Sequence, residues 1–264
     1  MKKYLKIWWR ILRMSLMQSM IYRSDMICGS ITSLIFFVIQ ICLIKLLYVV
    51  GGINQIAGFT IDQMYVILAL SQIEIFFIFV FVQSNTPLVL NQINNGLLDF
   101  FLLKPVNKYF LIMNQKYVAV QSYVIILYLL VFMPYLYSIG AINFTSWQWG
   151  WIIFIVLISL VVHAVLLWVA VLLNFFWPNF KTMYMFMNNI LDITRYPKQV
   201  YPQIIQDVFF YIIPIFLIMN PIYDILAGNW KWLDGVRVLA ITFIFLLIFV
   251  NIFGYGLNRY NSAA

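Results

Sequence analysis

Three ionisable side chains lie within long apolar stretches, where a charge needs a specific partner. Glu74 follows Gln72 in the middle of one stretch, His163 is central in another, and Lys45 lies near the end of a third. Because an ionisable group in an apolar medium is costly unless it is paired or hydrated, each is a candidate functional residue. For Glu74 and His163 the alternative is a hydrogen-bonded structural role. Lys45 is placed to extend its charge toward the nearby polar boundary.

The sequence offers little for catalysis. Its aspartates are scattered over loops and the ends of apolar stretches, so no acids converge with a base or a nucleophile. Cys28 and Cys42 lie 14 positions apart near opposite ends of one stretch, too far for a disulfide if that stretch is helical. The sequence has no Cys/His cluster with metal-ligand spacing and no phosphate-binding loop ending in Gly-Lys-Ser/Thr. We therefore expect neither an enzyme nor a resident metal or cofactor.

The composition predicts an all-α integral membrane protein. Of the 264 residues, 65% are hydrophobic and only 9% are charged, which is too little polar surface for a soluble protein of this length. A helix needs about 20 apolar residues to cross a hydrocarbon core, and several stretches reach that length. They are apolar on all sides, whereas the strands of an outer-membrane barrel alternate apolar and polar residues.

We expect one transmembrane domain, residues 1–264, with about six spans. Five follow from apolar stretches: residues 27–50, 63–84, 109–139, 151–176 and 236–257. The third is long enough to be tilted or preceded by an interfacial turn. An even number of spans requires one more crossing between Pro178 and Asp234. The two candidates there, 180–196 and 208–219, are both short, so a short span combined with a re-entrant or interfacial helix is expected.

Residues 1–24 predict an amphipathic helix in the membrane interface. Its two stripes carry cations and large apolar side chains: Lys2, Lys6, Arg10 and Arg13 on one, and Leu5, Trp8, Trp9, Leu12 and Leu16 on the other. The cations would face lipid headgroups and the tryptophans the acyl boundary. The positive-inside rule places this end in the cytoplasm. A signal peptide is the alternative, but the following apolar stretch is long and lacks a small-residue cleavage site.

The loop 88–106, between the second and third expected spans, is too apolar for a solvated linker. It contains Leu97, Leu98, Phe100, Phe101, Leu102 and Leu103, together with the charged residues Asp99 and Lys104. Turn-forming residues at 94–96 and at Pro105 delimit it as a discrete unit. An apolar patch of this size is typical of a docking site for a partner. The alternative is a helix that lies among the lipid headgroups.

In these segments the chain resembles the permeases of type-2 ATP-binding-cassette (ABC) exporters, and among them a compact six-span sub-group. The resemblance rests on four places: residues 96–106, Arg195-Tyr196-Pro197 with Tyr201-Pro202, Pro214 with Asn220-Pro221, and residues 259–263. Together with the basic amphipathic start and the number of spans, these places cover the whole chain. Each motif is weak by itself, whereas their order and spacing are fairly specific.

The resemblance implies a permease subunit that has no ATPase motif of its own. It implies a cytoplasmic interface helix at 1–24, a coupling helix within 88–106, a fifth span at 180–197 and an outer re-entrant hairpin at 198–222. Residues 97–101 and Lys104 would contact the ATPase, which would bind the ATP and Mg. The rival assignment makes 203–221 the fifth span, because this keeps Arg195 and Lys198 on the cytoplasmic side.

The expected partners are an ABC ATPase subunit, a second permease (a copy or a homologue) and membrane lipid, with no nucleic acid. The expected location is a bacterial cytoplasmic membrane, with both termini in the cytoplasm. No sequence feature selects a substrate. A channel-like or structural membrane protein without ATP coupling is the alternative function, and ion conductance by the protein alone would favour it.

Overall fold

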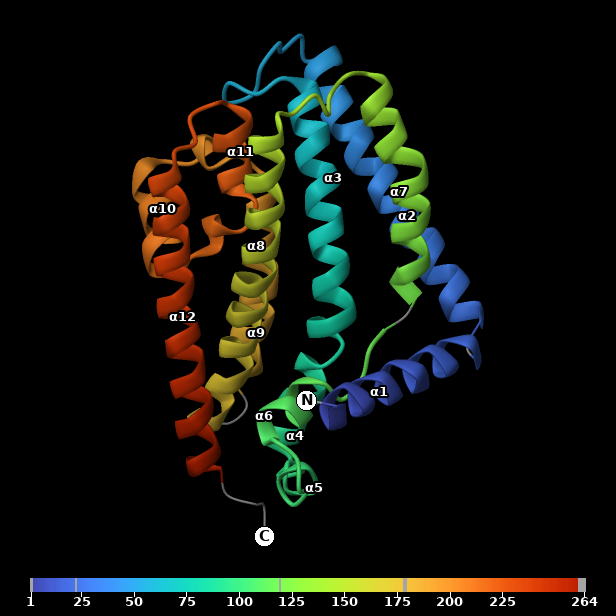
Figure 1. Ribbon diagram of the computed structural model, residues 1–264, viewed down its shortest axis with the longest axis vertical. Helices are drawn as coiled ribbons and strands as arrows, with labels where there is room; N and C mark the ends of the chain where they lie inside the picture. Colours follow the sequence, from blue (N-terminus) through green and yellow to red (C-terminus); the bar gives the residue numbers. More distant parts are fainter. Residues whose placement is uncertain (1, 22, 119, 178–179, 261–264) are drawn as a thin grey trace.

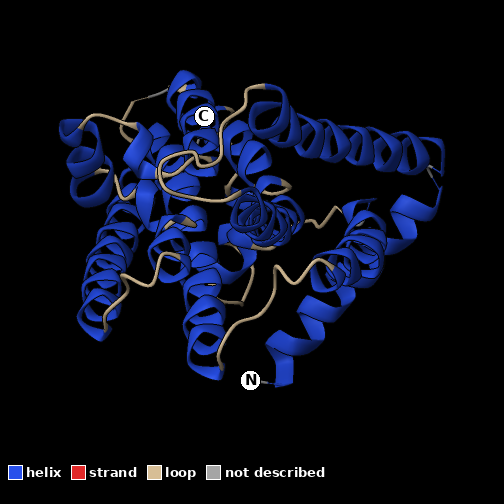
Figure 2. Ribbon diagram, turned by 90° about the horizontal axis from the view of Figure 1, so that it is seen from above, coloured by secondary structure: helices blue, strands red, loops and turns tan. Residues whose placement is uncertain are grey.

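The computed structural model describes residues 2–21, 23–118, 120–177 and 180–260, and the regular structure of this part is helical (Figures 1 and 2). Four stretches are long and apolar enough to cross a membrane: Arg23–Val50, Ile61–Asn94, Ser146–Phe175 and Trp232–Arg259. The prediction of an all-α protein with membrane-spanning helices is thereby confirmed at this coarser level.

The long helices run along the longest axis of the molecule (Figure 1). They are α2 (Arg23–Lys45) with its π-helical end η1 (Leu46–Val50), α3 (Ile61–Ile78) with η2 (Phe79–Gln83), α8 (Ser146–Leu172) with η3 (Leu173–Phe175), and α12 (Trp232–Arg259). Capping boxes fix two of their starts. Thr60 exchanges hydrogen bonds with Gln63 at the start of α3, and Thr145 does so with Gln148 at the start of α8.

The segment expected as the third span, residues 109–139, forms two helices. These are α6 (Lys108–Met113) and α7 (Val120–Ser138), and the latter packs against α2 and α3. The helix does not continue through 115 and 116 because the backbone N–H groups of both residues donate to Asn85 Oδ1, at 2.8 and 2.9 Å. An aromatic cluster joins α7 to α2, with the ring of Phe37 4.6 Å from that of Tyr128 and 5.0 Å from that of Phe132.

The segment expected as the fifth span is shorter than a typical crossing. It consists of α9 (Lys181–Ile190) and the 3-10 helix η4 (Leu191–Arg195). A series of short elements follows: η5 (Lys198–Val200), α10 (Gln203–Asp207), η6 (Val208–Ile212), η7 (Ile215–Leu217) and α11 (Asn220–Leu226). Residues 203–221, the span of the rival assignment, therefore do not form one continuous helix. An ion pair of 2.6 Å between Lys198 and Asp224 holds η5 to α11.

Three short elements and the N-terminal helix gather at one end of the molecule. Besides α6 these are α4 (Thr86–Asn94) and α5 (Asp99–Leu102), and α1 (Lys2–Ile21) crosses this end at a large angle to the long helices (Figure 1). The single coupling helix expected within 88–106 is thus two helices, separated where Gly96 adopts a left-handed φ of +68°. We call this end the α5 end; α11 lies at the opposite end (Figure 1).

Close packing fixes the last helix against its neighbours. A Cβ atom at Gly256 would overlap the ring of Phe175 in η3, and one at Gly235 would overlap the ring of Trp151 in α8. Glycine at these two positions therefore allows α12 to approach α8 and η3 closely. This contact fixes the C-terminal end of α12 beside the loop that contains α5.

Candidate functional site

Glu74 and His163 form a buried pair between α3 and α8. His163 Nδ1 lies 2.6 Å from Glu74 Oε1, and the exposed fractions of the two side chains are 9% and 2%. Because an ionised carboxylate only accepts hydrogen bonds, Nδ1–H of His163 is the donor when Glu74 is charged. Ser71, Glu74 and Ile78 recur at helical spacing on the buried face of α3. The fold thereby brings together two residues that the sequence indicated only separately.

A polar cavity of about 250 Å³ lies beside this pair, and we call it the α3–α8 cavity. Its polar lining comprises Ser71, Glu74, Gln83, His163, Asn188, Asp192 and Thr194. Gln83 Nε2 donates to Asn188 Oδ1 at 2.7 Å, which joins η2 to α9. A polar space of this size can hold several water molecules. Glu74 therefore faces protein and a hydratable cavity, as the cost of exposing a carboxylate to lipid requires.

The other two polar candidates lie outside the α3–α8 cavity. Gln72 points to the other side of α3, where its Nε2 donates to Gln40 Oε1 of α2 at 2.6 Å. This amide pair stabilises the contact between the two helices. Lys45 is exposed at the end of α2, in the position expected for a side chain that reaches the membrane boundary.

At the α5 end, the apolar residues of the expected docking loop divide into two groups. Leu97, Phe100 and Leu103 are exposed, with 46%, 69% and 83% of their surface accessible. Leu98 is fully buried, and Phe101 and Leu102 are partly buried against the core. The exposed group, which we call the α5 surface, can contact a partner. Leu98 instead anchors the loop to the protein.

Specific polar contacts hold this loop in place. The backbone N–H of Leu98 donates to the Tyr260 hydroxyl at 3.0 Å, which ties the loop to the end of α12. Burial raises the pKa of Tyr260 above its usual range, although this hydrogen bond partly offsets the effect. Lys104 Nζ lies 4.9 Å from the centre of the Phe101 ring, a cation–π contact, and Asp99 begins α5. The α5 surface is therefore presented on a fixed support.

The N-terminal helix contacts the same loop. Lys3 Nζ donates to the carbonyl of Pro105 at 3.2 Å, and the ring of Tyr4 packs edge-on against Phe110 at 5.1 Å. Farther along α1, Ser15 Oγ accepts a hydrogen bond of 3.0 Å from the N–H of Tyr117. The cationic residues of the expected interface helix, which are Lys2, Lys6, Arg10 and Arg13, are all exposed, whereas Trp8 is half-buried and Trp9 is exposed.

Asn85 is a buried residue whose role the sequence did not indicate. Its Oδ1 accepts from the N–H groups of Gln115 and Lys116, and its Nδ2 donates to the carbonyls of Phe81 and Lys116, at 2.9 and 2.8 Å respectively. One amide thus links the end of η2 to the segment that precedes α7. An Asn beside Pro87 is typical of many loops, so no signal in the sequence distinguished this one.

A comparison with protein families gives a match over most of the chain. The family is described as ABC-2 family transporter protein, and the match covers residues 34–264. The chain belongs to the ABC-2 transporter family. Comparisons with curated proteins and with solved structures gave no match.

Membership makes this ABC-2 protein the membrane component of an ABC transporter, in a family that lacks an ATPase domain. It also implies association with an ABC ATPase, which confirms the broad functional prediction. The match includes the α3–α8 cavity, the α5 surface and α12, and it begins after α1. The two candidate sites of this ABC-2 protein therefore lie within the part of the chain that defines the family.

Proposed function

We propose that this protein is a permease subunit of an ATP-driven exporter and that its α5 surface docks the ATPase. The exposed side chains of Leu97, Phe100 and Leu103 carry this proposal. Burial of the three in a partner's groove would contribute roughly 1.5–3 kcal/mol each before the entropic costs of association. Contacts with Tyr260 and Lys3 fix the loop, so that little additional ordering is needed when the ATPase binds.

The proposal that the protein is an exporter permease includes a six-span topology in which the α5 end faces the cytoplasm. The chain runs along the long axis of the molecule in α2, α3, α7, α8 and α12 (Figure 1). In this proposal the shorter segment of α9 with η4 supplies the sixth crossing. Cations are concentrated on α1, between α5 and α7, at the start of α9 and at the end of α12. The elements α1, α5 and α6 lie at the α5 end (Figure 1), and the cations are Lys2, Lys3, Lys6, Arg10, Arg13, Lys104, Lys108, Lys116, Lys181 and Arg259. The positive-inside rule then assigns this end to the cytoplasm. The elements from η5 to η7 become an outer re-entrant hairpin.

The α3–α8 cavity supplies a polar region at the depth of the spans. A transport path needs polar groups that are shielded from lipid, and Glu74 with His163 meets this requirement. One subunit provides one such cavity and one α5 surface. We therefore infer that the working transporter contains a second permease, either a copy of this chain or a homologue.

Replacement of Phe100 and Leu103 by serine tests the docking proposal. Both side chains are exposed, so the membrane domain should fold as before. Loss of two apolar anchors should reduce copurification with the co-expressed ATPase by at least about tenfold. A Trp147→Ser variant is the matched control, because Trp147 is 65% exposed but lies in α8 near its start, away from the α5 end.

Cysteine cross-linking gives a second readout. In a background in which the exposed residues Cys28 and Cys42 are replaced by serine, Phe100→Cys should cross-link to the ATPase and Trp147→Cys should not. Leu98 is unsuitable for the probe, because its side chain is fully buried. If the serine double variant copurifies with the ATPase at the wild-type ratio, the loop is an interfacial helix and the docking proposal is wrong.

A further inference from the structure

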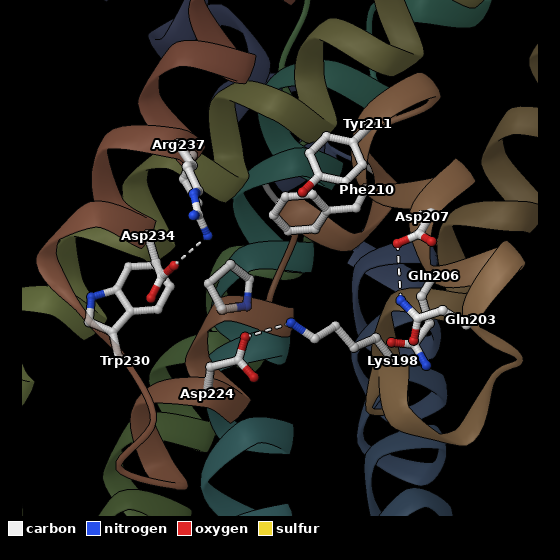
Figure 3. A pocket seen from close by; sticks show the side chains of 12 residues that line it. Lys198, Gln203, Gln206, Asp207, Phe210, Tyr211, Asp224, Trp230, Asp234 and Arg237 are labelled. Atoms are coloured by element: carbon white, nitrogen blue, oxygen red, sulfur yellow. Dashed lines mark hydrogen bonds and ion pairs between the residues drawn. The ribbon is translucent and has the colours of Figure 1, made fainter.

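A second polar cavity lies at the end of the molecule opposite α5, between the segment 198–211, α11 and the start of α12. Its volume is about 190 Å³, and Figure 3 shows the side chains that line it. The charged lining consists of Lys198, Asp207, Asp224, Asp234 and Arg237. Phe210, Tyr211 and Trp230 supply an aromatic wall. We call it the hairpin cavity, and neither the α5 surface nor the α3–α8 cavity includes any of these residues.

The hairpin cavity presents both signs of charge. Lys198 Nζ lies 2.6 Å from Asp224 Oδ2, and Arg237 Nη1 lies 3.2 Å from Asp234 Oδ1. Asp207 accepts a hydrogen bond of 3.1 Å from Gln203 Nε2. Across the cavity from Asp207, the guanidinium of Arg237 contacts Asp234 through Nη1, and 66% of the Arg237 side chain is exposed (Figure 3). A cationic and an anionic group therefore remain able to bind a ligand on opposite sides.

The chemistry of the lining argues against a metal ion. Among the residues that the structure describes, no group of three or more His, Cys, Asp or Glu side chains could hold one. The three aspartates of the hairpin cavity are instead distributed around it, two of them within 3.2 Å of a cation. A ligand that carries separate positive and negative charges suits this arrangement better than a single ion.

Exposed apolar surface adjoins the hairpin cavity. Tyr211 and Ile212 are 60% and 67% exposed on η6. On α12 the side chain of Ile244, which lies on the same helix face as Arg237 because it is seven positions farther along, is 53% exposed. In a membrane protein such surface contacts acyl chains. A ligand with a charged head and an apolar tail could therefore occupy the cavity and this surface together.

We propose that the hairpin cavity binds the headgroup of a zwitterionic phospholipid that carries a primary ammonium, as in phosphatidylethanolamine. The phosphate contacts the guanidinium of Arg237, which can donate two parallel hydrogen bonds. The ammonium contacts the carboxylate of Asp207, and the acyl chains lie along η6 and α12. A trimethylammonium group has no N–H to donate, so the site discriminates against choline lipids. This assignment does not depend on where the ATPase docks.

Lipid retention tests the assignment. The protein is purified from nanodiscs that contain equal amounts of phosphatidylethanolamine, phosphatidylglycerol and phosphatidylcholine, and the retained lipid is quantified by mass spectrometry. The ethanolamine lipid should be enriched over each of the others by at least about threefold, the order expected for partly exposed charge contacts. Arg237→Gln should remove this enrichment. Asp207→Asn should abolish the preference for ethanolamine over choline while phosphate binding remains.

Two matched variants serve as controls. Arg259→Gln removes an exposed cation from the other end of α12, and Asp62→Asn removes an exposed carboxylate at the start of α3; both should retain the wild-type preference. Equal retention of the three lipids by the wild type would overturn the proposal, as would an unchanged preference in Arg237→Gln. Soluble glycerophosphoethanolamine should compete only weakly; competition as effective as that of the whole lipid would show a site for a soluble phosphate compound instead.

Discussion

Glu74 lies in α3 with 2% of its side chain exposed, and its carboxylate is 2.6 Å from His163. Glu74→Gln keeps the shape of the side chain but replaces the carboxyl group that pairs with His163. We expect a loss of about 1–3 kcal/mol in the free energy of unfolding and a lower transport-coupled ATPase rate in the reconstituted complex. Thermal unfolding and ATPase assays would measure both effects.

A double-mutant cycle separates the pair from its surroundings. His163→Gln should cause a similar loss, and the double variant should be little worse than either single one, because both remove the same interaction. Lys45→Met is the control: Lys45 is exposed, so its replacement should change stability by less than about 0.5 kcal/mol. Strictly additive losses at Glu74 and His163 would contradict a shared role.

The hydrogen bonds of the buried Asn85 side chain lead to a separate prediction. Asn85→Ala leaves two backbone N–H groups and two backbone carbonyls without the partner amide. Because each buried unsatisfied group costs about 1–3 kcal/mol, we expect marked destabilisation around the segment 115–117. Hydrogen exchange should show lost protection at Gln115 and Lys116. Asn91→Ala, at an exposed position on α4, should leave it intact; equal loss in both variants would exclude the special role of Asn85.

At the scale of elements, apolar length predicted α2, α3, α8 and α12 within a few residues, because these helices are long and uniformly hydrophobic. The break between α6 and α7 could not be predicted in detail, since it depends on hydrogen bonds that the N–H groups of Gln115 and Lys116 donate to Asn85, about 30 positions away in sequence. The same limit applies to the candidate sites. Sequence indicated the apolar loop, but only the folded structure shows that the Leu98 side chain is buried, with its N–H bonded to Tyr260, while Phe100 remains exposed.

The contact of α12 with η3 gives a prediction at this scale. A Cβ at Gly256 would overlap the Phe175 ring and lie 2.9 Å from its Cγ atom, so Gly256→Ala must displace α12 or the ring. Overpacking of this kind costs about 1–3 kcal/mol. The displacement should also weaken the bond between Tyr260 and Leu98, one turn farther along.

Thermal unfolding would measure the loss of stability in Gly256→Ala, and copurification of the ATPase would measure the weakened support of the α5 surface. Gly254→Ala is the matched control, because a Cβ there would lie 3.6 Å from the Tyr109 hydroxyl, an ordinary contact. If Gly254→Ala and Gly256→Ala behave alike, the close approach of α12 to η3 does not determine stability.

At the scale of the whole molecule, exposed apolar helices lie on its outside. In the most apolar 18 residues of Arg23–Val50 only 6% are buried within the chain, and in those of Trp232–Arg259 only 17% are. Lipid or another permease must cover this surface in the membrane. By contrast, 61% of the most apolar 18 residues of Ile61–Asn94 are buried, so α3, which lines the α3–α8 cavity, lies largely inside the protein.

The expected number of permease and ATPase subunits follows from the way in which the α5 surface is connected to the long helices. The α5 surface is joined through α4 to η2 and α3, and through α6 to the segment held by Asn85. Movement of an attached ATPase can therefore be transmitted to α3 and α7. The described part of one chain offers one such surface, so two ATPases that close on each other need two permeases. We expect a complex of two permeases and two ATPase subunits.

Native mass spectrometry of the co-expressed complex would test this stoichiometry. The double variant Phe100→Ser with Leu103→Ser should lose the ATPase subunits and retain the pair of permeases. A stable and transport-competent assembly of one permease with one ATPase would contradict this stoichiometry.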